Sequence, residues 1–236
     1  MFDFQGSSIL VIGGSSGVGL AAAKILDRMG ANVTIASRNL EKLRQAKRLL
    51  GSTAQHLQLD LTDTAQVQAL RDGPLWNHVV ISAADTPMGS ITTLNDDDAR
   101  QAMESKFWGA YTAAKYIPVS AEGSITFVAG YLSVRPGRAS ALQSAINAAL
   151  EALGRALALE LAPVRVNTVS PGLLDTRLWD ALPSEKRSEM FHAVANKLPV
   201  GRVGLPDDAA KAICFLIDNG YTTGSTLYVD GGGRIA

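Results

Sequence analysis

The sequence is poor in the residues that build disulfides and metal centres. Its 236 residues include one cysteine and three histidines. A single thiol excludes an intramolecular disulfide and a metal site made of several cysteines. That cysteine, Cys214, stands in the apolar run 212–217, where we expect a buried and unreactive thiol. No metal ion is expected.

Neither sign of charge is in excess, because 22 Lys and Arg residues balance 22 Asp and Glu residues. This balance gives no field that would attract nucleic acid or an anionic membrane surface. Apolar runs are short and interrupted by Gly, Pro or charge, and the first residues resemble neither a signal peptide nor a membrane span. We therefore expect a cytoplasmic protein with a small-molecule substrate and with no nucleic-acid or membrane partner.

What the chain does contain is a regular alternation of short apolar runs and amphipathic stretches. This pattern predicts one α/β domain over residues 1–236, a Rossmann-type, doubly wound parallel sheet of seven strands with helices on both faces. Strands are expected at residues 9–13, 33–37, 54–59, 78–82, 124–129, 164–169 and 226–229. Helices are expected at 17–29, 40–50, 64–71, 96–116, 139–161, 184–197 and 206–219, with Asp96 and Pro206 at helix starts.

The first expected strand runs directly into a glycine-rich loop, residues 11–19. Gly13 suits a tight turn, Gly17 lets backbone approach phosphates, and Gly19 lets the following helix lie close to the strand. The positive end of that helix suits a pyrophosphate. The expected cofactor contacts are Gly13, Ser15, Ser16, Gly17, Val18 and Gly19. The alternative is an ordinary loop of Gly and Ser.

The ends of the second and third expected strands should face the adenosine. The second ends in Ser37 and Arg38 with no acid, which favours NADP(H), because a cation there holds a 2′-phosphate. Arg38 could instead be a solvated residue at a helix start. Asp60, followed by Leu61, could accept a hydrogen bond from the adenine amine or could cap the next helix.

Three further segments carry a family resemblance: VNTVSPGLLDT at 166–176, GRVGLP at 201–206 and TGSTLYVDGG at 223–232. With the glycine loop, they make the chain resemble a classical-type short-chain dehydrogenase/reductase over essentially its whole length. The resemblance implies a substrate lid at about 176–200 and a homodimer or homotetramer packed through the two long helices and the last strand. It also implies cofactor contacts at Ser82, Ala83, Ala84, Asn147, Pro171, Gly172, Leu174 and Thr176.

The chain departs from the family at all four catalytic positions. The resemblance puts Gln143 in place of the tyrosine, Asn147 in place of the lysine, Gly130 in place of the serine and Lys106 in place of the asparagine. The lysine and asparagine positions have thus exchanged residue types. The exchange could keep one ammonium in the pocket, or it could reflect drift after loss of function.

Tyr131 is the one tyrosine that the sequence places near the nicotinamide. It could donate a proton to a carbonyl if its hydroxyl turns inward, but we favour a packing role, because an unassisted phenol has a pKa of about 10. A literal Tyr-x-x-x-Lys occurs at Tyr111 and Lys115. On one continuous helix these residues lie about 140° and about 180° away from Lys106, so we regard this match as a decoy.

The catalytic candidates are Lys106, Tyr131, Gln143 and Asn147. They lead to two hypotheses. In the first, the protein is an NADP(H)-dependent oxidoreductase acting on a carbonyl or alcohol with a non-standard proton donor. In the second, it is a catalytically inactive NADP(H)-binding protein, a sensor or a partner subunit.

Overall fold

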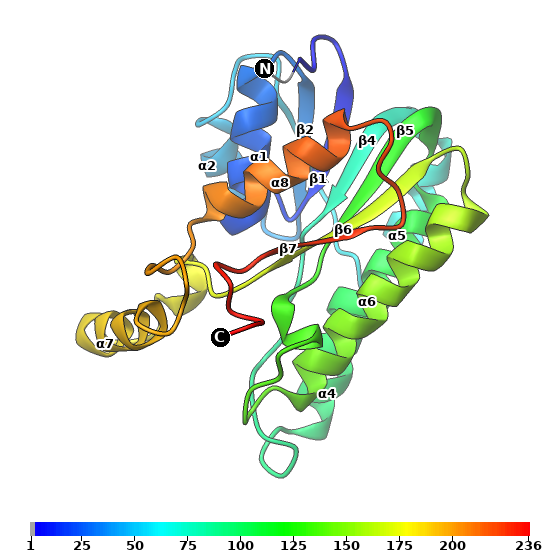
Figure 1. The fold of residues 1–236 in the computed structure, drawn as a ribbon. Coiled ribbons are helices and arrows are strands. Elements are labelled where there is room, and N and C mark those ends of the chain that lie inside the picture. The colour runs from blue at the N-terminus through cyan, green and yellow to red at the C-terminus, as the bar shows by residue number, and fades with distance from the viewer. Residues whose placement is uncertain (1–2) are drawn as a thin grey trace.

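The computed structural model describes residues 3–236, and its seven strands form one parallel sheet in the order β3-β2-β1-β4-β5-β6-β7 (Figure 1). The strands are β1 (Ser8–Ile12), β2 (Asn32–Ser37), β3 (Gln55–Gln58), β4 (Trp76–Ile81), β5 (Val119–Val128), β6 (Arg165–Pro171) and β7 (Thr226–Val229). The strand order reverses between β1 and β4. In open α/β sheets, ligands bind at the carboxyl ends of the strands at such a switch point. The predicted doubly wound α/β fold is confirmed.

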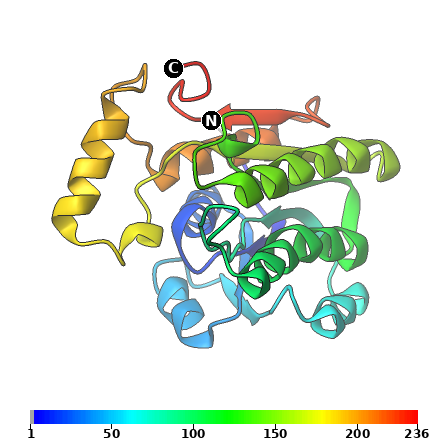
Figure 2. The same ribbon diagram turned by 90° about the horizontal axis from the view of Figure 1, so that it is seen from below.

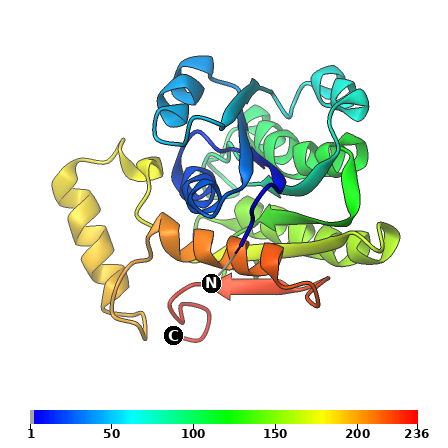
Figure 3. The same cartoon turned by 90° about the horizontal axis from the view of Figure 1, so that it is seen from above.

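Helices cover both faces of this sheet, as the views from below and above show (Figures 2 and 3). One face carries α1 (Gly17–Arg28), α2 (Leu40–Lys47) and α8 (Pro206–Asp218). The other carries α3 (Thr64–Ala69), α5 (Gly109–Tyr116) and α6 (Ala141–Glu160). Two more helices, α4 (Asp96–Met103) and α7 (Ser184–Ala195), extend beyond the sheet at the end where the strands finish (Figure 1).

Strand β1 illustrates how the sequence produces these two layers. Ile9 and Val11 pack into the core shared with α1 and α8, whereas Leu10 and Ile12 pack into the core shared with α5. Successive side chains of a strand point to opposite faces, so a strand that is covered on both faces must be apolar throughout. Short continuous apolar runs therefore predicted the strands.

The structure corrects several predicted boundaries. The helix expected at 96–116 is interrupted by a π-helical turn, Glu104–Trp108, between α4 and α5. The predicted start of the first part at Asp96 is confirmed, and Asn95 caps it by accepting from the N–H groups of Asp97 and Asp98. Strand β5 begins at Val119 and not at 124. The prediction missed its first residues because they lack an apolar pattern. Elsewhere the predicted and observed elements overlap along most of their length.

The segment expected to form the lid lies at the edge of the molecule. Residues 176–200 contain a short 3-10 turn, Arg177–Trp179, and helix α7. No residue of α7 is buried within the part of the chain that the structure describes, and the helix stands away from the sheet (Figure 1). The role of this segment as a substrate lid stays a prediction.

Cys214 lies on α8 with its side chain 0% exposed, and burial raises the pKa of its thiol to about 12. The predicted burial of this thiol is therefore confirmed. Among residues 3–236 there is no group of three or more His, Cys, Asp and Glu side chains that could hold a metal ion. None of the helices in that range is long and apolar enough to span a membrane.

Candidate active site

The glycine loop joins β1 to α1 at the carboxyl edge of the sheet, as predicted. Gly13 has φ 86° and Gly17 has φ 52°, a region that side chains disfavour. A Cβ on Gly13 would lie 2.6 Å from the Ala83 backbone nitrogen, and one on Gly19 would collide with the Gly13 carbonyl. Ser16 precedes α1 without a capping side-chain hydrogen bond from any described residue. The open N–H groups at this positive helix end can bind an anion.

A cleft of about 670 Å³ opens at this edge of the sheet. Its walls are the loops after β1 to β5, the π-helical turn and the first residues of the lid. The predicted cofactor contacts that line it are Gly13, Ser15, Ser16, Gly17, Val18, Gly19, Ser37, Arg38, Asp60, Leu61, Ser82, Ala83, Ala84 and Thr176. The sequence therefore located most of the cleft correctly.

Four predicted cofactor contacts do not line the cleft: Asn147, Pro171, Gly172 and Leu174. The Leu174 side chain is 7% exposed and packs in the core. A Cβ on Gly172 would lie 2.8 Å from the Cα of Asp230, so this glycine faces the C-terminal segment. The family resemblance that suggested these residues does not fix where a side chain points, and their contact with the nicotinamide stays a prediction.

Two cations stand at the end of the cleft formed by the loop after β2. Arg38 was predicted there, and Lys42 of α2 was missed although it lies one helical turn further along the chain. The Nη2 atom of Arg38 donates to Oδ2 of Asp85 over 2.9 Å, and both side chains are about half exposed. This end of the cleft therefore carries two positive charges and one closely placed carboxylate.

Asp60 also lines the cleft, and the structure settles its local role. Its carboxylate accepts from the N–H and the hydroxyl of Thr62 at 3.0 and 2.8 Å. The cap of α3 is Asp63, which accepts from the N–H groups of Ala65 and Gln66. The hypothesis that Asp60 caps this helix is therefore wrong, and its contact with an adenine amine stays a prediction.

Lys106 projects from the π-helical turn into the cleft. Its Nζ donates to the Ala129 carbonyl at 3.0 Å and to Oδ1 of Asn147 at 2.7 Å. Burial away from water lowers the pKa of Lys106 to about 8. An amine with a pKa close to neutral pH can both give and take a proton. Turns of this kind are frequent at functional sites, because the extra residue redirects the side chains that follow.

Asn147, which the resemblance matches to the family's lysine, is 4% exposed and faces Lys106 across the site. A Cβ on Gly130 would lie 2.9 Å from Nδ2 of Asn147. The glycine at position 130 therefore makes room for the amide. Gly130 and Asn147 belong to one arrangement whose centre is the Lys106 ammonium.

Gln143, which the resemblance matches to the family's tyrosine, is 6% exposed, and its Nε2 donates to the Pro87 carbonyl. Its Oε1 is buried without a hydrogen-bond partner among the described residues. The side chain fixes the loop after β4 against α6. A primary amide cannot exchange a proton near neutral pH, so Gln143 positions its surroundings and does not replace the phenol.

Tyr131 lies on the 3-10 turn Tyr131–Ser133 and is absent from the residues that line the cleft. A Cβ on Gly233 would lie 3.2 Å from Cε2 of Tyr131, so the ring packs against the C-terminal segment. This arrangement favours the packing role for Tyr131.

The literal Tyr-x-x-x-Lys faces solvent on α5. Tyr111 is 39% exposed and makes an edge contact with Trp108, and Lys115 is exposed beside the Tyr116 ring. Neither residue lines the cleft. The predicted surface position of this motif is confirmed, although the angles behind it assumed a continuous helix, which the π-helical turn interrupts. That it takes no part in the reaction stays a prediction.

Sequence reasoning missed a buried carboxylate next to the site. Glu151, one turn beyond Asn147 on α6, is 5% exposed. Its Oε1 accepts from the hydroxyls of Ser133 and Ser170 at 2.6 and 2.7 Å, and its Oε2 accepts from Tyr228 at 2.9 Å. Ser170 in turn accepts from the Gly130 N–H at 3.2 Å. The spacing of 143, 147 and 151 on one helix face was the available signal.

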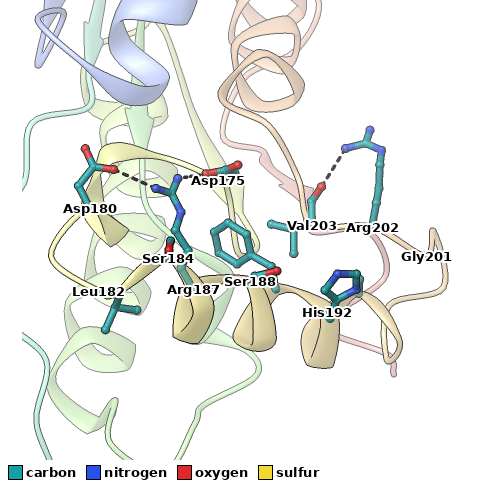
Figure 4. A pocket seen from close by; sticks show the side chains of 12 residues that line it. Asp175, Asp180, Leu182, Ser184, Arg187, Ser188, His192, Gly201, Arg202 and Val203 are labelled. Atoms are coloured by element: carbon teal, nitrogen blue, oxygen red, sulfur yellow. Dashed lines mark hydrogen bonds and ion pairs between the residues drawn. The ribbon is translucent and has the colours of Figure 1, made fainter.

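A second, more open pocket of about 790 Å³ lies between α7 and the loop at 201–203 (Figure 4). Arg187 of α7 donates there to the carboxylates of Asp175 and Asp180, the latter at 3.0 Å. Asp175 precedes Thr176, which lines the cleft. These ion pairs connect the lid helix to the edge of the cleft, although the two cavities share no lining residue.

Comparison with known proteins gives the same fold. Residues 13–233 match the family model described as Enoyl-(Acyl carrier protein) reductase. The short-chain dehydrogenase/reductase ATR9 of Stachybotrys chlorohalonatus is 33% identical over 254 residues, which cover 98% of this chain and 98% of that protein.

Two solved structures are also similar over nearly the whole chain. One, a small-chain dehydrogenase in complex with NADPH, is 34% identical with a TM-score of 0.85 and covers 98% of this chain and 100% of its own. The other is an apo short-chain oxidoreductase from Pseudomonas aeruginosa PAO1, described as containing an atypical catalytic center. It is 29% identical with a TM-score of 0.88 and covers 98% of each chain.

Proposed function

We propose, because the chain belongs to the short-chain dehydrogenase/reductase family, that it interconverts a carbonyl and an alcohol with NADP(H) and that Lys106 transfers the proton. The observation that carries this proposal is the Lys106 ammonium, held in the cleft by the Ala129 carbonyl and by Asn147. Of the four residues that the resemblance matches to catalytic positions, Lys106 alone has a side chain that titrates. Its pKa of about 8 suits proton transfer near neutral pH.

The residues that line the cleft fit the phosphate groups of NADP(H). Gly13 and Gly19 leave a cradle that a Cβ would fill, and the start of α1 offers open N–H groups to a pyrophosphate. Arg38 and Lys42 supply cations at the adenosine end. The similarity to a dehydrogenase in complex with NADPH supports the same choice. When bound, the nicotinamide supplies or accepts the hydride.

The role of Lys106 in the reaction follows from the number of N–H groups on its ammonium. A lysine ammonium has three N–H groups, and Lys106 uses two of them for Ala129 and Asn147. The third remains for a substrate oxygen. In the reducing direction the ammonium donates a proton to the developing alkoxide, and in the oxidising direction the neutral amine accepts it. Asn147 and the Ala129 carbonyl hold Nζ in place during both.

If Lys106 transfers the proton, the rates of reduction and of oxidation should depend on pH in opposite ways. Reduction should slow as the pH rises through about 8, because it needs the Lys106 ammonium, and oxidation should accelerate over the same range, because it needs the amine. Turnover at saturating cofactor and substrate, measured in both directions from about pH 6 to about pH 10, tests this. A midpoint well outside this range would instead indicate a proton donor other than Lys106.

Arg38→Ala should weaken NADPH binding by about tenfold to a hundredfold, because a charge-assisted hydrogen bond to a phosphate is lost, and should change NADH binding little. The measurement is a titration of each nucleotide that follows nicotinamide fluorescence. Arg44→Ala is the matched control, since Arg44 is exposed on α2 and lies outside the cleft. If the wild type bound neither nucleotide, the proposed function would be wrong. Tight NADPH binding without turnover of any carbonyl would favour an inactive binding protein.

A further inference from the structure

We infer that Asp85 determines cofactor specificity: it restrains the preference for NADPH and supports binding of NADH. This inference rests on the proposed binding of a nicotinamide dinucleotide in the cleft. It starts from the ion pair between Arg38 Nη2 and Asp85 Oδ2, 2.9 Å long, which joins two loops far apart in the sequence. Both residues line the cleft.

Both partners of this ion pair are anchored through their backbones. The Asp85 N–H donates to the hydroxyl of Ser105 at 3.1 Å, and the same hydroxyl donates to the Asp85 carbonyl at 2.8 Å. Ser105 is 6% exposed and lies in the π-helical turn next to Lys106. On the other side, Gln58 Nε2 donates to the Arg38 carbonyl at 3.0 Å. The backbone of each partner is therefore fixed at the wall of the cleft, and the ion pair joins the two side chains there.

The ion pair crosses the switch point of the sheet. Strands β2 and β4 lie on either side of β1, so the Arg38 and Asp85 loops flank the glycine loop. In this type of fold the end of the second strand faces the adenosine ribose. A nucleotide whose pyrophosphate binds at the glycine loop must therefore bring its ribose to the place where the guanidinium and the carboxylate meet.

The two cofactors differ in charge at this place. The 2′-phosphate of NADPH competes with Asp85 for the Arg38 guanidinium, and the two anions repel each other. The ribose hydroxyls of NADH are donors, so they can donate to the Asp85 carboxylate, as the carboxylate of NAD-specific folds accepts from the 2′-hydroxyl. One residue thus weakens binding of the first cofactor and strengthens binding of the second.

The test is a fluorescence titration of Asp85→Asn with NADPH and with NADH. We expect the dissociation constant for NADPH to fall about fivefold and that for NADH to rise by a similar factor, as for loss of one exposed charged contact. The variant keeps the shape of the side chain and both backbone bonds to Ser105. A ratio of the two constants that stays within about twofold of the wild-type ratio would overturn the inference.

A matched control and a second background sharpen this test. Asp97→Asn removes the same charge from another exposed ion pair, with Arg100 on α4 outside the cleft, and should leave the ratio unchanged. In an Arg38→Ala background, the gain in NADPH affinity from Asp85→Asn should shrink, because the competition is gone. An equal gain in both backgrounds would show that the ion pair is not the cause. If the wild type binds neither nucleotide, the proposed function fails first and this inference falls with it.

Discussion

Lys106→Met should lower the rate of carbonyl reduction by about 10² to 10⁴ while NADPH binding stays close to that of the wild type. Methionine has a similar length but carries no proton to give. The glycine loop and Arg38, which bind the nucleotide in our proposal, are not altered. We expect a stability loss of about 1 to 3 kcal/mol, because the Asn147 amide oxygen and the Ala129 carbonyl lose their donor. Single-turnover kinetics together with NADPH titration separate these effects.

Lys115→Met is the matched control for this experiment. It makes the same substitution in the literal Tyr-x-x-x-Lys, where Lys115 is exposed on α5 and outside the cleft. We expect full turnover in this variant and in Tyr131→Phe, whose ring packs against the C-terminal segment. Loss of turnover in Lys115→Met with normal turnover in Lys106→Met would overturn the assignment of Lys106. Loss in Tyr131→Phe alone would return the proton donor to that tyrosine.

The fold could be predicted from the sequence because the apolar pattern that defines each strand lies within a few consecutive residues. Each strand of a sheet covered on both faces needs a continuous apolar run, and β1, with Leu10 facing one core and Val11 the other, meets that need. The π-helical turn at 104–108 could not be predicted, because it keeps the amphipathic pattern of a helix and adds only one residue to a turn. That extra residue affects where Lys106 points.

The site was predictable only as far as backbone chemistry determines it. Glycines at a strand end predict a phosphate cradle because their conformations and close contacts belong to the backbone. The position of Asp85 depends on Ser105, and the orientation of the Tyr131 ring depends on the C-terminal segment. Such choices follow from contacts between distant parts of the chain, which one sequence does not display.

The second large effect that we expect is a loss of stability when Glu151 is replaced. Glu151→Ala should lower the free energy of unfolding by about 3 kcal/mol, because it removes the acceptor of three hydroxyls at once. The donors are Ser133, Ser170 and Tyr228, and the Ser170 side chain is 0% exposed. Buried hydroxyls that have lost water and their partner carry the full cost of desolvation. Urea unfolding of the wild type and the variant measures the difference.

Two comparison variants separate the network from the loss of a charge. Glu160→Ala changes an exposed glutamate at the end of α6 and should cost less than about 0.5 kcal/mol. Glu151→Gln should fall between the two at about 1 kcal/mol, because its amide keeps one acceptor and the hydroxyls can rotate to accept from its NH₂. If Glu151→Ala were as stable as Glu160→Ala, the three hydroxyls would have to find other partners, and the network would not support the fold.

The same carboxylate should also influence catalysis through a chain of contacts. Glu151 orients the Ser170 hydroxyl, which accepts from the Gly130 N–H, and the neighbouring carbonyl of Ala129 accepts from Lys106. Loss of Glu151 therefore loosens the turn that holds the ammonium. We expect Glu151→Ala, assayed well below its melting temperature, to reduce turnover by about tenfold and to change NADPH affinity little, because the glycine loop is not part of this chain of contacts. A loss of NADPH affinity equal to the loss of turnover would mean that Glu151 supports the whole cleft and has no particular effect on Lys106.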